Sequence, residues 1–310
     1  TASEMESWRR SLPAFSAFAG PTTLWLMVFF LIPLALIWLY SFGENVSLTE
    51  IKTTWTLANY ERIFAPEIAT LFWRTLKLAG IATVICIIIG YPVALVIATA
   101  DQKWKPWLLL IVILPFWTNL LIRTYAMLNI LGSRGRINDV LNWLWVQADG
   151  VLDFVGLGDM ALLGERFIPV KFLGTELGVV MGLTYVHLPF AILPIYSALE
   201  RIDRSYLEAS LDLGAGQLRT FFLILVPLTA AGLITAAIIT FIPALGSFLT
   251  PDLLGRGQVD MIANVIERQF KKANDWPFGS ALSLFLLYVT FIILAIRSII
   301  DMQRSKGRRA

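Results

Sequence analysis

Few side chains in this sequence belong to the types that carry out catalysis or bind metals. Among the 310 residues there is one histidine, His187, and one cysteine, Cys86. An intramembrane enzyme would need a nucleophile beside a base, and a metal site would need several companion ligands. We interpret His187 as a hydrogen-bonded packing residue and Cys86 as a small core residue that cannot form an internal disulfide.

Carboxylates are also missing from the middle of the apolar stretches. The nearest to such a position are Asp252 and Glu176, each at the end of a stretch. An ion-coupled secondary transporter usually needs a titratable or ion-coordinating side chain near the membrane midplane. The sequence therefore disfavours both an intramembrane enzyme and a secondary transporter, and the transporter is kept as an alternative.

The composition indicates a chain that lies mostly in lipid. Hydrophobic residues make up 57% of the sequence, charged residues 15%, and the mean hydropathy is +0.71. A helix needs about 20 apolar residues to cross the hydrocarbon core of a bilayer. The stretches that qualify are residues 22–42, 74–100, 107–131, 175–200, 232–250 and 279–302. We predict an all-α membrane protein with six transmembrane helices in a single domain, residues 22–302.

The charged segments indicate the orientation. Arg9 and Arg10 precede a first stretch that is too long for a signal peptide and is followed by no small-residue cleavage site. Residues 1–21 are expected at the cytoplasmic surface, and residues 303–310 as a basic cytoplasmic tail. Because Lys and Arg in short loops favour the cytoplasm, both termini are predicted to lie inside. A polar loop at about 201–231 then faces the cytoplasm.

This loop begins with the signals of a short helix. Ser205 and Glu208 have the spacing of a capping box, which predicts a helix start at Ser205. Leu207 and Leu211 would share one face of that helix. Gly214 permits the left-handed backbone with which helices often end.

A second short helix is expected from Gln217. It would carry Phe221, Phe222 and Leu225 as an apolar stripe, and Pro227 would break it before the fifth span. These signals fit an ordinary connection between two spans as well as a compact surface that docks a partner.

The loop resembles a known coupling element. Residues 208–232 read EASLDLGAGQLRTFFLILVPLTAAG, with acid, small residues, glycine and proline at the spacings of the EAA loop of binding-protein-dependent ABC import permeases. Ser210 stands where that family commonly has a second alanine. The resemblance implies the type I ABC importer permease (MetI-like) fold and a loop that docks into a groove on an ATP-binding subunit. The implied coupling residues are Glu208, Ala209, Ser210, Leu211, Gly214, Ala215, Phe222 and Pro227.

The resemblance also implies partners. The sequence has no G-x-x-x-x-G-K-[ST] phosphate-binding motif, so ATP and Mg are expected in a separate ATPase, and no cofactor or catalytic residue is expected in this chain. The expected complex holds a homologous second permease, two ATP-binding subunits and an extracytoplasmic solute-binding protein, in lipid of the bacterial inner membrane. The sequence pI of about 9.0 needs no nucleic acid, since Lys and Arg beside the membrane explain it.

Three further segments narrow the resemblance to the spermidine and putrescine permeases. They are VILPFWTNLLIRTYA at 112–126, SYLEASLDLGA at 205–215 and NDWPFG at 274–279. The predicted function is therefore half of a translocation pathway for polyamines. The outside loop at 132–174 is longer than in the enteric polyamine permeases, so an importer of another small solute is the alternative.

A pathway for polyamines should offer aromatic faces and carboxylates to extended cations. Asp252 is the acidic candidate, at the mouth, and Arg123 is expected to organise a gate, either reaching outward or pairing with an acid. Simple helix packing is the competing interpretation of each aromatic candidate. These candidates are Tyr91, Trp117, Tyr125, Tyr185 and Phe248.

Overall fold

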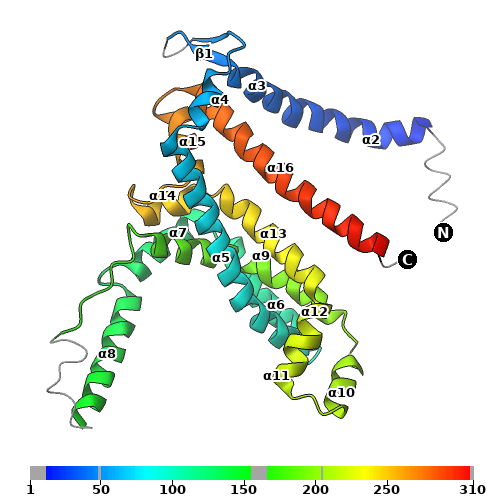
Figure 1. The fold of residues 1–310 in the computed structure, drawn as a ribbon, viewed down its shortest axis with the longest axis vertical. Coiled ribbons are helices and arrows are strands. Elements are labelled where there is room, and N and C mark those ends of the chain that lie inside the picture. The colour runs from blue at the N-terminus through cyan, green and yellow to red at the C-terminus, as the bar shows by residue number, and fades with distance from the viewer. Residues whose placement is uncertain (1–11, 48–49, 155–165, 204, 308–310) are drawn as a thin grey trace. The chain divides into compact units, whose positions relative to one another are not determined.

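The computed structural model describes residues 12–47, 50–154, 166–203 and 205–307 (Figure 1). This described part is helical apart from one two-stranded hairpin. It divides into two units, residues 1–69 with 265–310 and residues 70–264. The predicted coupling loop and the predicted pathway residues all belong to the second unit.

The first unit packs the C-terminal helix against N-terminal elements. Its elements are α2 (Leu12–Leu26), η1 (Met27–Leu31), α3 (Ile32–Ser41), β1 (Gly43–Asn45), β2 (Ile51–Thr53), α4 (Ala58–Ile63), most of α15 (Ile262–Lys271) and α16 (Trp276–Gly307). The strands are antiparallel, with Glu44 opposite Lys52. α16 packs against α3 and α4. Arg62 fixes the start of α16, because its Nη2 lies 2.9 Å from Asp275 Oδ2 and its guanidinium lies 3.8 Å from the centre of the Phe278 ring.

The second unit contains the remaining helices, except for the first four residues of α5, which belong to the first unit. They are α5 (Pro66–Thr99), α6 (Lys105–Ile113), η2 (Leu114–Trp117), α7 (Leu120–Leu131), α8 (Arg136–Phe154), α9 (Glu176–Glu200), α10 (Ser205–Asp212), α11 (Gln217–Thr220), η4 (Phe221–Leu225), α12 (Val226–Leu228), α13 (Ala230–Leu245) and α14 (Leu249–Gly255). α9 is the centre of this unit and contacts α7, α13 and α14. Small residues allow the close approach, since a methyl group at Gly232 of α13 would collide with Ala198 of α9.

Two π-helical segments have the same cause. η1 and η4 each end two residues before a proline, Pro33 and Pro227. A proline ring clashes with the carbonyl four residues earlier and lacks an N–H, and a widened turn relieves this clash. The helix after η4 therefore continues through Pro227 as α12. The predicted break at Pro227 lies instead at Thr229, between α12 and α13.

Four of the described helices are long and apolar enough to cross a membrane. They are Ala19–Ser41, Pro66–Thr99, Glu176–Glu200 and Trp276–Ala295. The other two predicted spans are not straight helices. The stretch 107–131 bends by 94° between Trp117 and Leu120, and the fifth span is preceded by a 68° bend at Thr229 and ends at Leu245. The described residues thus hold up to six spans if each bent pair counts as one.

Candidate functional site

The loop before α13 begins with a capped helix. α10 starts at Ser205, as predicted, but the acceptor for its first turn is Asp203, whose Oδ1 receives the Ser205 N–H at 3.0 Å. This hydrogen bond holds the pKa of the Asp203 carboxyl below its ordinary value. The predicted capping box is therefore wrong in its cap, which lies two residues earlier than Ser205. Glu208 remains exposed on the first turn.

Gly214 ends α10 as predicted. Its φ is +79°, in the left-handed region. The Gly214 N–H donates to the Leu211 carbonyl at 2.9 Å, and the Ala215 N–H donates to the Ser210 carbonyl at 3.1 Å. This pair of bonds is the Schellman motif, which satisfies carbonyls at the end of a helix. The turn at Gly214 lets α11 fold back beside α10.

A hydroxyl pair joins the two short helices. Ser210 Oγ lies 2.9 Å from Thr220 Oγ1, and both side chains are buried. Ser210, predicted with the coupling residues, therefore faces the interior of the loop. Its hydroxyl, which an alanine would lack, binds α10 to α11. Thr220 was missed, because nothing in its local sequence marks it as the partner.

The outer face of the loop is apolar at four points. The exposed fractions are 48% for Leu211, 89% for Leu213, 76% for Leu218 and 63% for Phe222. We call these four residues the exposed apolar face. Leu213 and Leu218, which flank the turn, are among the most exposed large apolar side chains of the described residues. Leu213 and Leu218 were missed, although apolar residues flanking a turn glycine are a readable signal.

The inner face packs on the core of the unit. Leu207 and Phe221 contact the cluster formed by residues of α5 and α9, and Leu225 is buried in it. Leu207 and Leu211, one helical turn apart on α10, line the same cavity, as expected for residues that share one face of the helix. Glu208, Ala209 and Pro227 are exposed.

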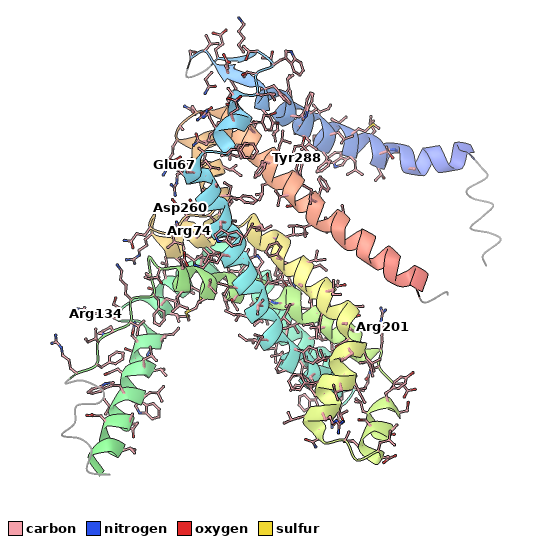
Figure 2. The ribbon with its side chains drawn as sticks, viewed as in Figure 1. Glu67, Arg74, Arg134, Arg201, Asp260 and Tyr288 are labelled. Atoms are coloured by element: carbon pink, nitrogen blue, oxygen red, sulfur yellow. The ribbon has the colours of Figure 1, made fainter. Side chains whose placement is uncertain are left out.

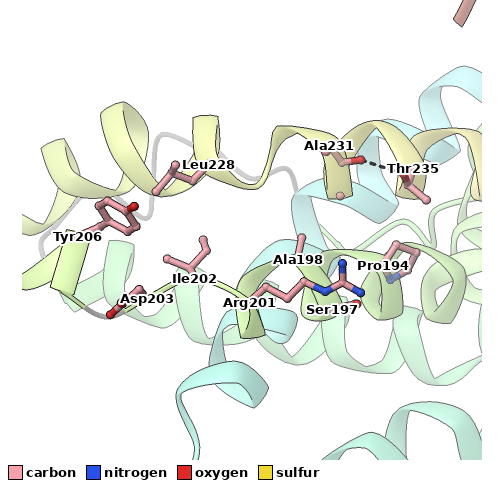
Figure 3. A pocket seen from close by; sticks show the side chains of 11 residues that line it. Pro194, Ser197, Ala198, Arg201, Ile202, Asp203, Tyr206, Leu228, Ala231 and Thr235 are labelled. Carbon is pink, nitrogen blue, oxygen red and sulfur yellow. Dashed lines mark hydrogen bonds between the residues drawn. The ribbon is translucent and has the colours of Figure 1, made fainter. Parts of the chain in front are cut away.

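Cavities lie on two sides of the loop. One, of about 650 Å³, is lined by residues of α9, α12 and α13 that include Ala198, Leu228 and Gly232, with Tyr206 of α10 (Figure 3). Arg201, which follows α9 and projects away from the ribbon (Figure 2), lies at this cavity's rim. The other, of about 350 Å³, is lined by the ends of α5 and α9 with Glu208 of α10. The loop therefore has open space on both sides.

Tyr91 is buried where the loop packs against α5. It is 5% exposed in the core, its hydroxyl lies 3.0 Å from Thr229 Oγ1, and its ring meets that of Phe221 edge-on at 5.2 Å. A residue lining a path between two subunits would be exposed in this single chain. The prediction of Tyr91 as a pathway residue is therefore corrected to a packing residue.

The other predicted pathway aromatics are exposed. Asp252, on the first turn of α14, is exposed as well. None of them lines either of the two cavities around the loop. The exposed aromatics are Trp117, Tyr125, Tyr185 and Phe248.

Arg123 and His187 are buried. Arg123, expected to reach outward or pair with an acid, is 8% exposed, lies 5.7 Å from the centre of the Phe116 ring and has an Nε with no hydrogen-bond partner. His187 Nδ1 donates to the Leu183 carbonyl at 2.8 Å, which confirms a packing role. Cys86 is buried and donates to the Thr184 carbonyl at 3.4 Å, as a core residue does. Within the described residues, no three His, Cys, Asp or Glu side chains are grouped to hold a metal.

Comparison with known proteins decides the family of this chain. The family described as "Binding-protein-dependent transport system inner membrane component" matches residues 10–305. The chain belongs to this family. The predicted membership of the ABC import permeases is thereby confirmed.

Individual relatives match over most of their length. The chain is 40% identical over 276 residues to the spermidine/putrescine transport system permease protein PotB of Haemophilus influenzae, covering 88% of each chain. It is 37% identical over 272 residues to PotB of Escherichia coli, covering 88% of this chain and 92% of the relative. The crystal structure of a bacterial ABC transporter that imports the acidic polysaccharide alginate matches with a TM-score of 0.67 and 17% identity, over 96% of this chain. That likeness supports the importer permease fold.

Proposed function

We propose that this chain forms half of the translocation pathway of an ATP-driven importer of spermidine and putrescine. The observation that carries the substrate is the identity with two polyamine permeases across most of both chains. The family carries the importer class, in which a solute-binding protein delivers the cargo. The complex would hold a homologous second permease, two ATPase subunits and this receptor, in the inner membrane of a bacterium.

The loop supplies the coupling in this proposal. Its exposed apolar face can fill a groove on an ATP-binding subunit, and the exposed Glu208 can pair with a basic or amide group there. ATP and Mg would bind in that subunit, so this chain would have neither a cofactor nor a catalytic residue. With both termini in the cytoplasm, the loop lies on the ATPase side.

The pathway would use the exposed aromatics and Asp252. Aromatic faces attract ammonium groups by cation–π contact, and a carboxylate at the mouth attracts them by charge. Arg123, buried beneath Phe116, would organise the gate rather than bind a cation, because like charges repel. The second permease would supply the other acidic contacts.

The test is the ATPase activity of the complete complex in lipid with loaded binding protein. Spermidine, putrescine and a neutral solute are compared for wild type, Glu208→Ala and a control, Glu67→Ala, which removes an exposed acid outside the loop. We expect stimulation by polyamines only, reduced at least about fivefold in Glu208→Ala and unchanged in the control. Stimulation by the neutral solute would replace the substrate, and full activity of Glu208→Ala would contradict the docking role of Glu208.

A further inference from the structure

The bend at Thr229 is where the loop joins the spanning helices. The helical segments before and after it, Gln217–Leu228 and Ala230–Leu245, are inclined to each other by 68°. Thr229 is fully buried, and α12 is only three residues long. Any movement of the loop must therefore pass through this residue or bend the chain at it.

One side chain from another helix holds the bend. The Thr229 hydroxyl lies 2.9 Å from the Leu225 carbonyl and 3.1 Å from the Val226 carbonyl, so its single proton is donated within the loop. The Tyr91 hydroxyl, 3.0 Å away, must then be the donor to Thr229 Oγ1. Tyr91 lies 138 residues earlier in the sequence, on α5.

Tyr91 contacts the loop at a second point. Its ring packs edge-on against Phe221, at the beginning of η4. One tyrosine therefore touches both ends of the segment 221–229. Its own helix is fixed in the unit, since a methyl group at the neighbouring Gly90 would press against Ile192 of α9.

Open space adjoins the bend. The cavity of about 650 Å³ is lined there by Leu228, Ala231 and Gly232, which flank Thr229 in the sequence (Figure 3). The residues that flank Thr229 thus border open space, whereas Thr229 itself is tied to α5 by the Tyr91 hydroxyl. Without the tie, the bend could absorb a displacement of the loop.

We propose that Tyr91 is a positioning residue that makes the loop and α5 move as one body, through the hydrogen bond from its hydroxyl to Thr229. The inference rests on the proposed docking of the loop to an ATPase. When the ATPase displaces the loop, Tyr91 passes the displacement to α5 and, through Gly90, to α9. ATP hydrolysis then moves the spanning helices.

The chemistry of the bond selects the variants. Tyr91→Phe removes the donor but leaves the Thr229 proton on the Leu225 carbonyl, so no buried donor loses its acceptor. Thr229→Ser keeps the acceptor oxygen and should behave as wild type. Tyr196→Phe is the matched control, because that tyrosine lies on a spanning helix and its hydroxyl bonds to Glu200 on the same helix.

The first readout is a distance within the permease. In a Cys86→Ala background, the complete complex in nanodiscs carries spin labels at Leu223 of η4 and Val84 of α5, both exposed. With wild-type Tyr91 the distance between the labels should be the same with and without ATP and Mg. In Tyr91→Phe it should change with ATP. If the distance depends on ATP in wild type, the proposal that Tyr91 joins the loop to α5 is overturned. It is also overturned if the distance depends on ATP in neither protein.

The second readout is spermidine uptake per ATP hydrolysed in proteoliposomes. Tyr91→Phe should keep its stimulated ATPase activity while uptake per ATP falls at least about fivefold, and Thr229→Ser and Tyr196→Phe should match wild type. Equal uptake per ATP in Tyr91→Phe and wild type would overturn the proposal. If wild type is not stimulated by polyamines, the proposed substrate fails, whereas the label distances still decide about the joint.

Discussion

The two predicted spans that bend do so in opposite ways. The bend of 94° between Trp117 and Leu120 is exposed, and its polar groups form hydrogen bonds with neighbouring residues. Thr118 Oγ1 donates to the Pro115 carbonyl at 2.7 Å, and Asn119 Oδ1 accepts the Leu121 N–H at 2.8 Å. At Thr229 the bend is buried and is held by a side chain from another helix. A bend with local partners sets the direction of one helix, whereas a bend with a distant partner links two helices.

The largest effect is expected from crowding the buried bend. Gly232→Ala would place a methyl group into the Ala198 side chain, with the Pro194 carbonyl 3.1 Å away. Overpacking of this kind costs about 3 kcal/mol of unfolding free energy. Thermal unfolding of the purified complex should show the loss. Gly216→Ala, in open space, is the control, and equal losses in the two variants would contradict the close contact between α9 and α13.

Removing the hydroxyl at each bend should separate the two kinds of partner. Thr229→Val leaves the buried Tyr91 donor without its acceptor and should cost about 2 kcal/mol, because an unsatisfied buried donor keeps its full desolvation penalty. Thr118→Val removes an exposed local bond and should cost about 0.5 kcal/mol or less. Denaturation of both variants under the same conditions checks this, and a larger loss for Thr118→Val would reverse the comparison.

A further comparison concerns the cap of the exposed bend, whose loss should cost less than the loss of the buried Thr229 hydroxyl. Asn119→Ala removes the acceptor for the Leu121 N–H and should cost about 1 kcal/mol, while Asn119→Asp keeps an acceptor and most of the stability. Uptake per ATP should not change in either variant, because no other helix depends on this cap. A fall in uptake per ATP without a fall in stability would show that the exposed bend also transmits movement.

The sequence predicts features whose causes are local. The left-handed turn at Gly214 and the start of α10 at Ser205 follow from neighbouring residues, and so do the four straight spans. Hydropathy carries no information on the direction of a helix axis, so it did not reveal the bend at Asn119 within a continuous apolar stretch. Pro115 and the Asn119 cap were its local signs.

Contacts across long stretches of sequence were not predictable. The sequence around Tyr91 is compatible with a tyrosine that lines a pathway and with one that packs on a buried threonine. Only the packing of α5 against the loop distinguishes these two roles. Ser210 stands where the family commonly has alanine, and its hydrogen-bond partner Thr220 lies in the next helix. The family resemblance indicated where the loop lies, and the structure shows which of its side chains point outward.

The widened turn at η4 also determines the direction in which the exposed leucine side chains point. A π-helical turn holds one residue more than the α-helical ladder needs, and each residue of an α-helix turns the chain by about 100°. Loss of a single residue between Phe221 and Leu225 would rotate Leu211, Leu213 and Leu218 by about that angle around the axis of the helix that leads to α13. The number of residues between these leucines and the buried bend therefore sets the direction in which the leucines point. In related chains we expect the residue types of this segment to vary more than the number of residues in it.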